Sequence, residues 1–431
     1  MKLSIIIPFY NSEKHLNDCL NSICNQIKHE IEIILINDSS TDKSVQICKK
    51  FLKKYEFLKL INVKKNKGVS YCRNLGIKNS TGKYICFLDS DDKYIKGSIK
   101  IILQYINKFY KKEIFILRSQ ENNKKVIDKN QFFNVNKKDN KKDIINFIKN
   151  FNKFRATCWN FIVKKEFLIS HNIQFKNIKV FEDQAFVSSI LCFAKKYKII
   201  SKPVYAKNTA ETDSLSKKTG YIVASSCAKT IYEISKIIYL KKNLLNKKKI
   251  KFLLSRLDFV IEQLLLNILV CKAHEIDNIA KYFVKKFLFI SKLPKSYLKK
   301  RIIFLNKKKD IKKRLLKYKF KKNKILKNLF YKIRKNKVII FCAGSYSEIV
   351  LKVLLNFGTK IDFICDNNFN YFGKKLYKRI VKNPKILEKK LYKFSNYKLL
   401  ICNNEKSQFN IIKKQLTKMG IKNRNIIHAS L

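Results

Sequence analysis

Four apolar segments alternate with polar, helix-forming stretches over the first 92 residues of the chain. The stretch between the first two segments, 11–26, has apolar or small residues at helical spacing. A strand that is covered on both faces is apolar along its whole length, and four segments have this character: Leu3–Ile7, Ile31–Ile36, Leu58–Val63 and Tyr84–Leu88. The alternation predicts a parallel α/β sheet, in which ligand-binding groups gather at the carboxyl ends of the strands.

The pattern changes twice along the remaining chain. Residues 93–215 are mixed, whereas about 216 to 335 is strongly basic, with helices expected at 221–240, 250–271, 275–290 and 307–334. From Lys337 a second strand–helix pattern begins, with strands expected at Val338–Cys342, Lys360–Cys365 and Lys398–Cys402. We therefore predict three parts: an α/β domain at 1–216, a basic α-helical region at 217–335 and a small Rossmann-like α/β domain at 336–431.

The chain carries 95 Lys+Arg against 31 Asp+Glu, a formal net charge of +64, which points to polyanionic partners. Only nine of the basic residues are arginine, and proteins that read base sequence usually rely on arginine for bidentate contacts. The lysine excess, with abundant isoleucine and asparagine, is typical of an A/T-rich genome. We therefore do not expect nucleic acid as a partner.

The cysteines and the apolar runs bear on the compartment. The twelve cysteines form no C-x-x-C pair and several lie within apolar runs, which is typical of small buried residues in a reducing compartment. The apolar N-terminal run ends at Pro8 and is too short for a signal peptide. The best transmembrane candidate, Leu257–Cys271, contains two carboxylates and is shorter than the roughly 20 residues that a span needs. We expect a soluble cytoplasmic protein, and peripheral contact with the inner face of the cytoplasmic membrane stays open.

Four motifs lie at or just after the predicted strand ends: Ser4–Asn11, Ile36–Ser44, Asn66–Asn74 and Phe87–Asp92. In their order and spacing they resemble the family 2 glycosyltransferases, whose fold is named GT-A. The resemblance implies an inverting transfer by direct displacement, from a nucleotide sugar to a hydroxyl of a bacterial surface glycan such as a capsule or lipooligosaccharide. It favours a UDP-sugar as donor and a glycan or lipid-linked glycan as acceptor.

An acidic pair, Asp89 and Asp91, follows the fourth predicted strand. Carboxylate oxygens are hard ligands that suit Mg²⁺ or Mn²⁺, and such a cation neutralises the charge on a leaving diphosphate. By the resemblance, Asp89 contacts the donor ribose and adds to the metal site, and Asp91 holds the metal. The alternatives are a solvated acidic turn or an N-cap for the following helix.

Four further residues suit a pocket for the donor nucleotide. At the first strand end Tyr10 can stack on a base, with Pro8 lining the same pocket, and Asp38 after the second strand can accept a hydrogen bond from the base edge. The alternatives are a partly buried aromatic for Tyr10 and a helix N-cap for Asp38. A guanidinium near strand ends suits diphosphate binding, which adds Arg73, with an exposed surface ion pair as its alternative.

A second acidic pair, Glu182 and Asp183, lies about 90 residues after the first. It resembles the family's acceptor side, where one carboxylate takes the proton of the attacking hydroxyl. The resemblance gives that role to Asp183 and a supporting or acceptor-positioning role to Glu182; an acidic pair at a helix N-terminus is the alternative. Trp159, the single tryptophan, either packs against the acceptor sugar or fills the core. No histidine follows within 203–216, so a completing metal ligand is absent, another residue or water.

Three alternatives stay open for the rest. The basic and apolar residues of 295–337 suit either an anionic membrane surface or a solvated connection between domains. In the C-terminal domain only Gly344 matches a dinucleotide fingerprint, with Asp366 placed for a ribose, so a docking or regulatory domain is the alternative. For the whole chain, a non-catalytic scaffold that binds glycan or sugar nucleotide at the membrane is the alternative to an enzyme.

Overall fold

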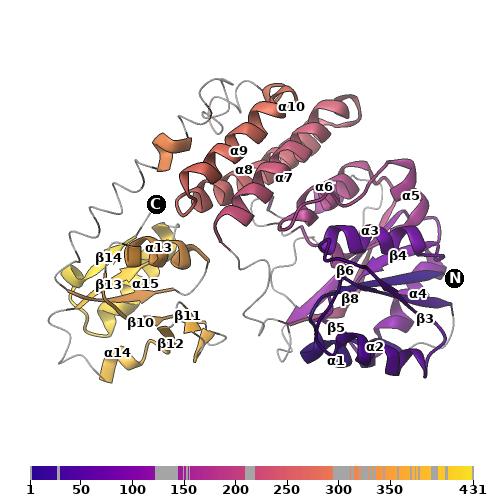
Figure 1. Cartoon of the computed structure of the whole chain (residues 1–431), viewed down its shortest axis with the longest axis horizontal. Coiled ribbons are helices and arrows are strands. Elements are labelled where there is room, and N and C mark those ends of the chain that lie inside the picture. The colour runs from indigo at the N-terminus through magenta and orange to yellow at the C-terminus, as the bar shows by residue number, and fades with distance from the viewer. Residues whose placement is uncertain are drawn as a thin grey trace. The chain divides into compact units, whose positions relative to one another are not determined.

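The computed structural model describes residues 2–26, 30–121, 144–208, 219–294 and 336–429, with gaps at 149, 152–153, 155, 343–344, 357–358, 369–370, 374, 377–378, 390–396 and 403–405, and isolated helical residues between 311 and 333. The chain divides into two compact units (Figure 1). Unit 1 is Met1–Thr209 with Lys229–Phe259, and unit 2 is Ala210–Ala228 with Val260–Leu431. Part of the predicted basic helical region therefore belongs to each unit.

Unit 1 contains an eight-stranded sheet with the order β3-β2-β1-β4-β7-β6-β8-β5. Its first half is parallel and is built from the four predicted segments: β1 (Leu3–Phe9), β2 (Ile31–Asn37), β3 (Leu58–Asn62) and β4 (Tyr84–Phe87). β1 and β2 are buried along their whole length, as continuous apolar segments with both faces covered should be. The polar segments that follow these strands lie along one edge of the sheet.

The second half of the sheet comes from the region where the sequence pattern is irregular. β7 (Phe161–Lys164) pairs antiparallel with β4, and β6 (Ile114–Glu121) pairs antiparallel with β7. β8 (Tyr197–Lys207) runs parallel to β6, and the short β5 (Lys93–Tyr94) pairs antiparallel with β8. The predicted α/β class is confirmed, as a mixed sheet whose parallel half carries the sequence motifs.

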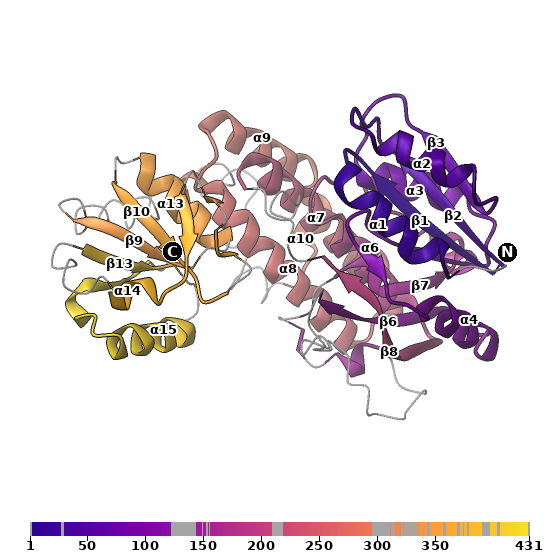
Figure 2. The same ribbon diagram turned by 90° about the horizontal axis from the view of Figure 1, so that it is seen from below.

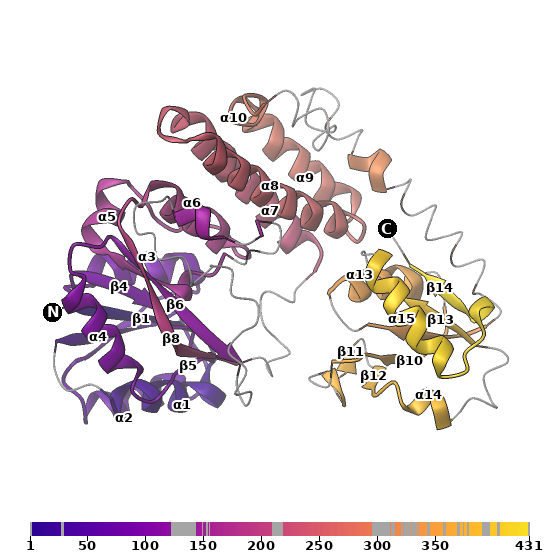
Figure 3. The same ribbon diagram turned by 180° about the vertical axis from the view of Figure 1, so that it is seen from behind.

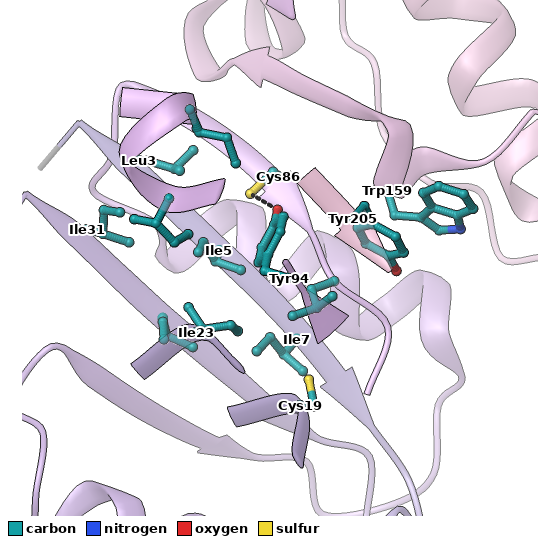
Figure 4. Packing of buried hydrophobic residues seen from close by; sticks show 14 of the residues in the cluster. Leu3, Ile5, Ile7, Cys19, Ile23, Ile31, Cys86, Tyr94, Trp159 and Tyr205 are labelled. Atoms are coloured by element: carbon teal, nitrogen blue, oxygen red, sulfur yellow. Dashed lines mark hydrogen bonds between the residues drawn. The ribbon is translucent and has the colours of Figure 1, made fainter. Parts of the chain in front are cut away.

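Helices cover both faces of the parallel half (Figure 1). On one face, α1 (Glu13–Cys24) and α2 (Ser44–Leu52) pack in a core with alternate residues of β1. On the other face lies α3 (Val69–Asn79), so close that a Cβ added at Gly76 would lie 2.4 Å from Ile6 Cγ2. The first core also takes in α4 (Ser98–Lys108), and Figure 4 shows its members Leu3, Ile5, Ile7, Cys19, Ile23, Ile31, Cys86, Tyr94, Trp159 and Tyr205.

A buried carboxylate ties β2 to its neighbours. Glu32 is 1% exposed and accepts hydrogen bonds from Ser4 Oγ at 2.6 Å, Thr81 Oγ1 at 2.8 Å and Lys59 Nζ at 2.8 Å. Burial raises the pKa of the Glu32 carboxyl, but the hydrogen bonds from Lys59, Ser4 and Thr81 outweigh burial and lower the pKa to about 2. This ionised group joins β1, β2, β3 and the turn before β4.

Two further described helices lie before β8 in the chain, and four follow it. Their bounds are α5 (Lys165–Ser170), α6 (Glu182–Phe193), α7 (Tyr221–Leu240), α8 (Lys247–Ile268), α9 (Ala273–Lys285) and α10 (Phe287–Ser291). The last four match the helices expected at 221–240, 250–271 and 275–290. The expected helix at 307–334 and the candidate membrane segment 295–337 fall almost wholly outside the described residues. Among the described helices, none is both long and apolar enough to cross a membrane.

Unit 2 contains a six-stranded sheet with the order β11-β12-β10-β9-β13-β14, of which Figure 2 labels the neighbouring strands β10, β9 and β13. Five of its strands are parallel: β9 (Lys337–Phe341), β10 (Ile361–Cys365), β12 (Arg379–Lys382), β13 (Tyr397–Ile401) and β14 (Ile426–His428). The short β11 (Lys375–Leu376) is antiparallel to β12, and the described helices of this half are α13 (Ser345–Asn356), α14 (Ile386–Lys389) and α15 (Lys406–Lys418). With the first strand in the middle, this is a Rossmann-like order. Gly344 lies outside the described residues, and Asp366 directly follows β10.

All twelve cysteines are free, and eleven of them are buried. Only Cys342, at the end of β9, is partly exposed. Burial raises the pKa of the Cys72 and Cys365 thiols to about 12. The cysteines therefore behave as small apolar residues of the two cores.

Candidate active site

Arg73 lies at the centre of the polar edge of the sheet in unit 1. It is carried by α3, and its side chain is 4% exposed. Nη1 donates to Glu182 Oε1 at 2.7 Å and to Asp183 Oδ1 at 3.1 Å, and Nη2 donates to Asp89 Oδ1 at 2.9 Å. The guanidinium also lies 5.2 Å from the ring centre of Phe175. One buried cation therefore joins the acidic loop after β4 to the start of α6.

The exposed surface ion pair, which was the alternative for Arg73, does not describe this arrangement. The guanidinium is buried, and both of its terminal nitrogens donate to carboxylates. Nε has no hydrogen-bond partner among the described residues. Any direct contact of Arg73 with a diphosphate stays a prediction, because the terminal nitrogens bind carboxylates in this structure.

The second acidic pair forms the first turn of α6. Phe181 precedes it with φ +67°, a left-handed conformation that turns the chain sharply into the helix. Asp183 uses its other oxygen, Oδ2, to accept a hydrogen bond from the backbone N–H of Cys158 at 3.1 Å. Asp183 is thus fixed by two donors from distant parts of the chain, Arg73 and Cys158.

Burial and neighbouring charges have opposing effects on the pKa values of Asp183 and Glu182. For Asp183, burial raises the pKa of the carboxyl, Arg73 lowers it and the charge of Asp89 raises it. For Glu182, burial and the neighbouring charge of Asp183 raise the pKa, and Arg73 again opposes them. A carboxyl whose pKa is raised toward neutrality is a stronger base when ionised, which suits a group that takes a proton from a hydroxyl.

The acidic loop after β4 carries three carboxylates in four residues. Asp89 is bound to Arg73, and its side chain is 31% exposed. Burial and the charge of Asp89 raise the pKa of Asp91 to about 6. Asp92 is buried; its Oδ2 accepts from Tyr205 Oη at 2.5 Å and its Oδ1 accepts from the backbone N–H of Asn208 at 2.7 Å. Burial, with the charges of Asp89 and Asp91, raises the pKa of Asp92 as well.

This loop is the candidate site for a divalent cation. Among the residues that the structure describes, no group of three or more His, Cys, Asp or Glu side chains is arranged to hold a metal ion. Mg²⁺ needs only one or two carboxylates when substrate phosphates and water complete its shell. Asp89 and Asp91 supply hard oxygen ligands. Burial is the main cause of the raised pKa of Asp91, and the negative charge of Asp89 adds a part that a cation would offset. The residues present fit a cation shared with a bound diphosphate.

Asp38, the residue predicted to bind the donor base, lies just after β2. This residue is 5% exposed, and its oxygens accept from the backbone N–H groups of Lys67 at 2.7 Å and Gly68 at 2.8 Å. Asp38 does not cap α2, where Asp42 Oδ1 accepts from the N–H of Ser44 at 3.0 Å instead. It fixes the loop that leads into α3, which is the helix that carries the guanidinium of Arg73.

Two other predicted donor residues come from β1 and the position after it. Pro8 is buried within β1, which its register places between β2 and β4. Tyr10 directly follows the strand and is 49% exposed, so its ring is available to a ligand. The alternative of a partly buried aromatic therefore fits Tyr10 only in part. Contacts of either residue with a base stay predictions.

Trp159 has the contacts of the core-filling alternative. It is 7% exposed and stacks on Tyr205 with ring centres 4.4 Å apart and planes inclined by 12° (Figure 4). Lys207 Nζ lies 5.8 Å from its ring centre. Because Tyr205 also donates to Asp92, the stack links the acidic loop to the segment that contains Cys158, whose backbone N–H binds Asp183.

Three contributors to the site were not among the residues predicted for it. Asp92 lies in the acidic motif itself and could have been included on that ground. Tyr205 gives no local signal, since it lies in a strand of the irregular region. The backbone N–H of Cys158 is a donor that no side-chain pattern can reveal.

Residues 4–171 match the family model described as glycosyl transferase family 2. The N-terminal part of the chain therefore carries a domain of this family. The predicted site residues all lie in unit 1, and the match ends before the Glu182–Asp183 pair.

Curated relatives agree with the family over the N-terminal half. The minor teichoic acid biosynthesis protein GgaB of Bacillus subtilis is 33% identical over 228 residues, which is 50% of this chain and 24% of that protein. The cholesterol galactosyltransferase of Borreliella burgdorferi is 28% identical over 216 residues, 47% of this chain and 59% of that protein. The chain thus spans less than two thirds of either relative.

A solved structure extends the likeness to more of the fold. S. aureus TarS 1-349 in complex with UDP-GlcNAc matches with a TM-score of 0.56 at 21% identity, covering 74% of this chain and 89% of that one. This likeness supports the GT-A fold for unit 1, as the resemblance of the sequence motifs implied.

Proposed function

We propose that the chain transfers a sugar from a nucleotide-sugar donor, a UDP-sugar, to a hydroxyl of a bacterial surface glycan, with inversion at the anomeric carbon. The observation that carries this proposal is the Arg73 cluster, because it brings the acidic loop after β4 and the acidic start of α6 to one place. The two groups are those that a direct displacement needs on its leaving side and its attacking side. The TarS complex with UDP-GlcNAc and a relative named for teichoic acid biosynthesis support the donor and acceptor classes.

On the donor side, the chain's own residues bind and orient the nucleotide. Tyr10 offers an exposed ring for stacking, and Pro8 and Asp38 line the same strand ends. Asp89 and Asp91 would hold Mg²⁺ or Mn²⁺. When bound, the cation supplies positive charge to offset the charge of the leaving diphosphate. Asp92 and Tyr205 keep the acidic loop in place through their 2.5 Å hydrogen bond.

On the acceptor side, Asp183 is the proposed base. The acceptor oxygen forms its bond to the anomeric carbon while the bond from that carbon to the diphosphate oxygen breaks. The electron pair of the broken bond leaves with the nucleoside diphosphate, and the hydroxyl proton passes to Asp183. Arg73 favours the ionised form of Asp183 before the step, and Glu182 lies beside it to orient the acceptor.

The acceptor's place in the cell is part of the same proposal. A glycan that is still attached to a lipid would bring the protein to the inner face of the cytoplasmic membrane, and the net charge of +64 would attract it to an anionic surface. Flotation with anionic and with neutral liposomes tests this point. We expect binding to the anionic vesicles that salt weakens, and equal binding to both kinds would contradict an electrostatic contact.

A donor panel assayed with purified protein tests the function, with Mn²⁺, Mg²⁺ or EDTA present. We expect turnover of a UDP-sugar that EDTA abolishes; full turnover in EDTA would remove the metal role of Asp91. Asp183→Asn should leave donor binding intact and lower turnover by roughly 10²-fold or more. Asp18→Asn, at an exposed Asp paired with Lys93, is the matched control and should change neither quantity. Donor binding without turnover of any sugar would favour the non-catalytic scaffold.

A further inference from the structure

The first half of α8, Lys247–Phe259, contains a buried arginine with an unusual set of partners. Arg256 has no exposed surface, and its terminal nitrogens donate to the backbone carbonyls of Phe154 and Phe151. The guanidinium lies among aromatic rings, 5.6 Å from the ring centre of Phe154 and 5.8 Å from that of Phe252. Among the described residues, Arg256 forms no ion pair with a carboxylate.

The segment whose carbonyls Arg256 binds leads to Cys158, which contacts the proposed base. Cys158 follows Phe154 by four residues, and its backbone N–H donates to Asp183 Oδ2. Between them the chain is buried at Ala156 and Cys158, which are 5% and 0% exposed. A shift at the carbonyls bound by Arg256 would therefore move one of the two donors that fix Asp183.

The same helix also contacts the turn that leads into α6, where the proposed base lies. The ring of Phe259 lies 5.7 Å from the ring of Phe181, with the planes at 82°. Phe181 is the left-handed residue that turns the chain into α6, one residue before the acidic pair. α6 and α8 can be followed in Figure 3. Arg256 and Phe259 lie three residues apart, on one face of α8, as helical spacing requires.

We infer that the first half of α8 positions the proposed base, with Arg256 and Phe259 as positioning residues that hold its two supports, the Cys158 segment and the Phe181 turn. This inference rests on the proposed function, since it concerns the same reaction. It gives the predicted basic helical region a part in the transferase site, beyond a connection between domains or a membrane surface. The family match, which ends at residue 171, does not include this helix.

The chemistry of Arg256 favours positioning over stability alone. A buried charge without a carboxylate partner is costly, and apolar residues of similar volume often replace buried charged groups with no loss of stability. A planar guanidinium instead offers several donors in a rigid fork, so it can fix two carbonyls relative to each other. A lysine would supply the charge but has no rigid fork.

The test is steady-state kinetics of the full chain with the donor that the donor panel identifies. Arg256→Met and Phe259→Leu should each lower kcat about tenfold or more while the donor KM stays within twofold, because misplacing a base by about 1 Å can cost 10²-fold. Arg256→Lys should restore part of the loss. Lys251→Met, at an exposed position of α8, is the matched control and should leave kcat unchanged.

A double variant separates positioning from general damage. If Arg256 acts through Asp183, Arg256→Met should cause little further loss in the Asp183→Asn background, since the group it positions is already disabled. Losses that multiply, or an unchanged kcat in both Arg256→Met and Phe259→Leu, would overturn the inference. If Arg256→Met does not fold, as judged by thermal melting, Arg256→Lys and Phe259→Leu decide the matter alone. An Asp183→Asn variant with full turnover would instead count against the proposed function itself.

Discussion

Arg73→Met removes the cation that lies between Asp89, Glu182 and Asp183. Its three hydrogen bonds to carboxylates are 2.7, 2.9 and 3.1 Å long. Removing one partner of a buried ion pair costs about 3–5 kcal/mol, because the remaining charge is left without compensation. Protonation of the carboxyls relieves part of this cost, so we expect the loss in free energy of unfolding to be largest at high pH and smaller near pH 5.

The effect on catalysis follows from the pKa of the base. Burial raises the pKa of the Asp183 carboxyl and the charge of Arg73 opposes this rise, so the variant should raise that pKa further. A larger share of the base is then protonated at neutral pH, so kcat should fall, by up to the roughly 10²-fold that a general base contributes, and recover as the pH rises. The donor KM should change little.

The assay is release of the nucleoside diphosphate, measured for kcat and donor KM between about pH 5.5 and 9.5. Arg73→Lys keeps the charge and should lie between the two extremes, and it also serves if the methionine variant does not fold. Arg424→Met, at an exposed arginine, is the matched control and should behave as the unchanged protein. A kcat within threefold at pH 7, or a loss that is the same at every pH, would refute the reasoning. A rise in donor KM alone would return Arg73 to a diphosphate-binding role.

Two further predictions concern stability. The pKa of Glu32 is lowered from 4.5 to about 2, so its stabilising contribution of about 2–3 kcal/mol is present above pH 4.5 and is lost as the pH falls toward 2. Glu32→Gln should therefore be less stable at pH 7 and should lack that part of the acid unfolding. An unchanged acid transition in denaturant titrations would contradict this. Tyr205→Phe keeps the stack on Trp159 but removes the hydrogen-bond donor to Asp92, so the free energy of unfolding should fall by about 1–3 kcal/mol. The loss should be larger at pH 9 than at pH 5, because at high pH the buried carboxyl of Asp92 must ionise with one donor fewer. Equal losses at the two pH values would count against that assignment.

The parallel half of the first sheet could be predicted closely because its strands are buried on both faces. Leu3–Ile7 was expected and β1 runs from Leu3 to Phe9, and Tyr84–Leu88 was expected where β4 runs from Tyr84 to Phe87. β8 escaped prediction because polar residues interrupt it, with Lys198 partly exposed and Ser201 and Lys202 exposed. Its sequence therefore shows no continuous apolar run.

The members of the site could be named from motifs, but their contacts could not. Arg73 and Glu182 are 109 residues apart in the chain, and only the packing of α3 against the segment that leads to α6 brings them to 2.7 Å. Motif spacing indicated which groups lie at strand ends, and so it assigned Arg73 to a diphosphate. It could not indicate that a buried guanidinium would contact three carboxylates.

The free thiols offer a natural probe of how this chain opens. Seven of the twelve cysteines lie in unit 1 (19, 24, 48, 72, 86, 158 and 192) and five in unit 2 (227, 271, 342, 365 and 402). A buried thiol reacts with an alkylating reagent only when the structure around it opens, so each labelling rate reports a local opening free energy. Peptide mapping after timed labelling would therefore measure, without any engineered tag, whether the two units unfold together or one before the other.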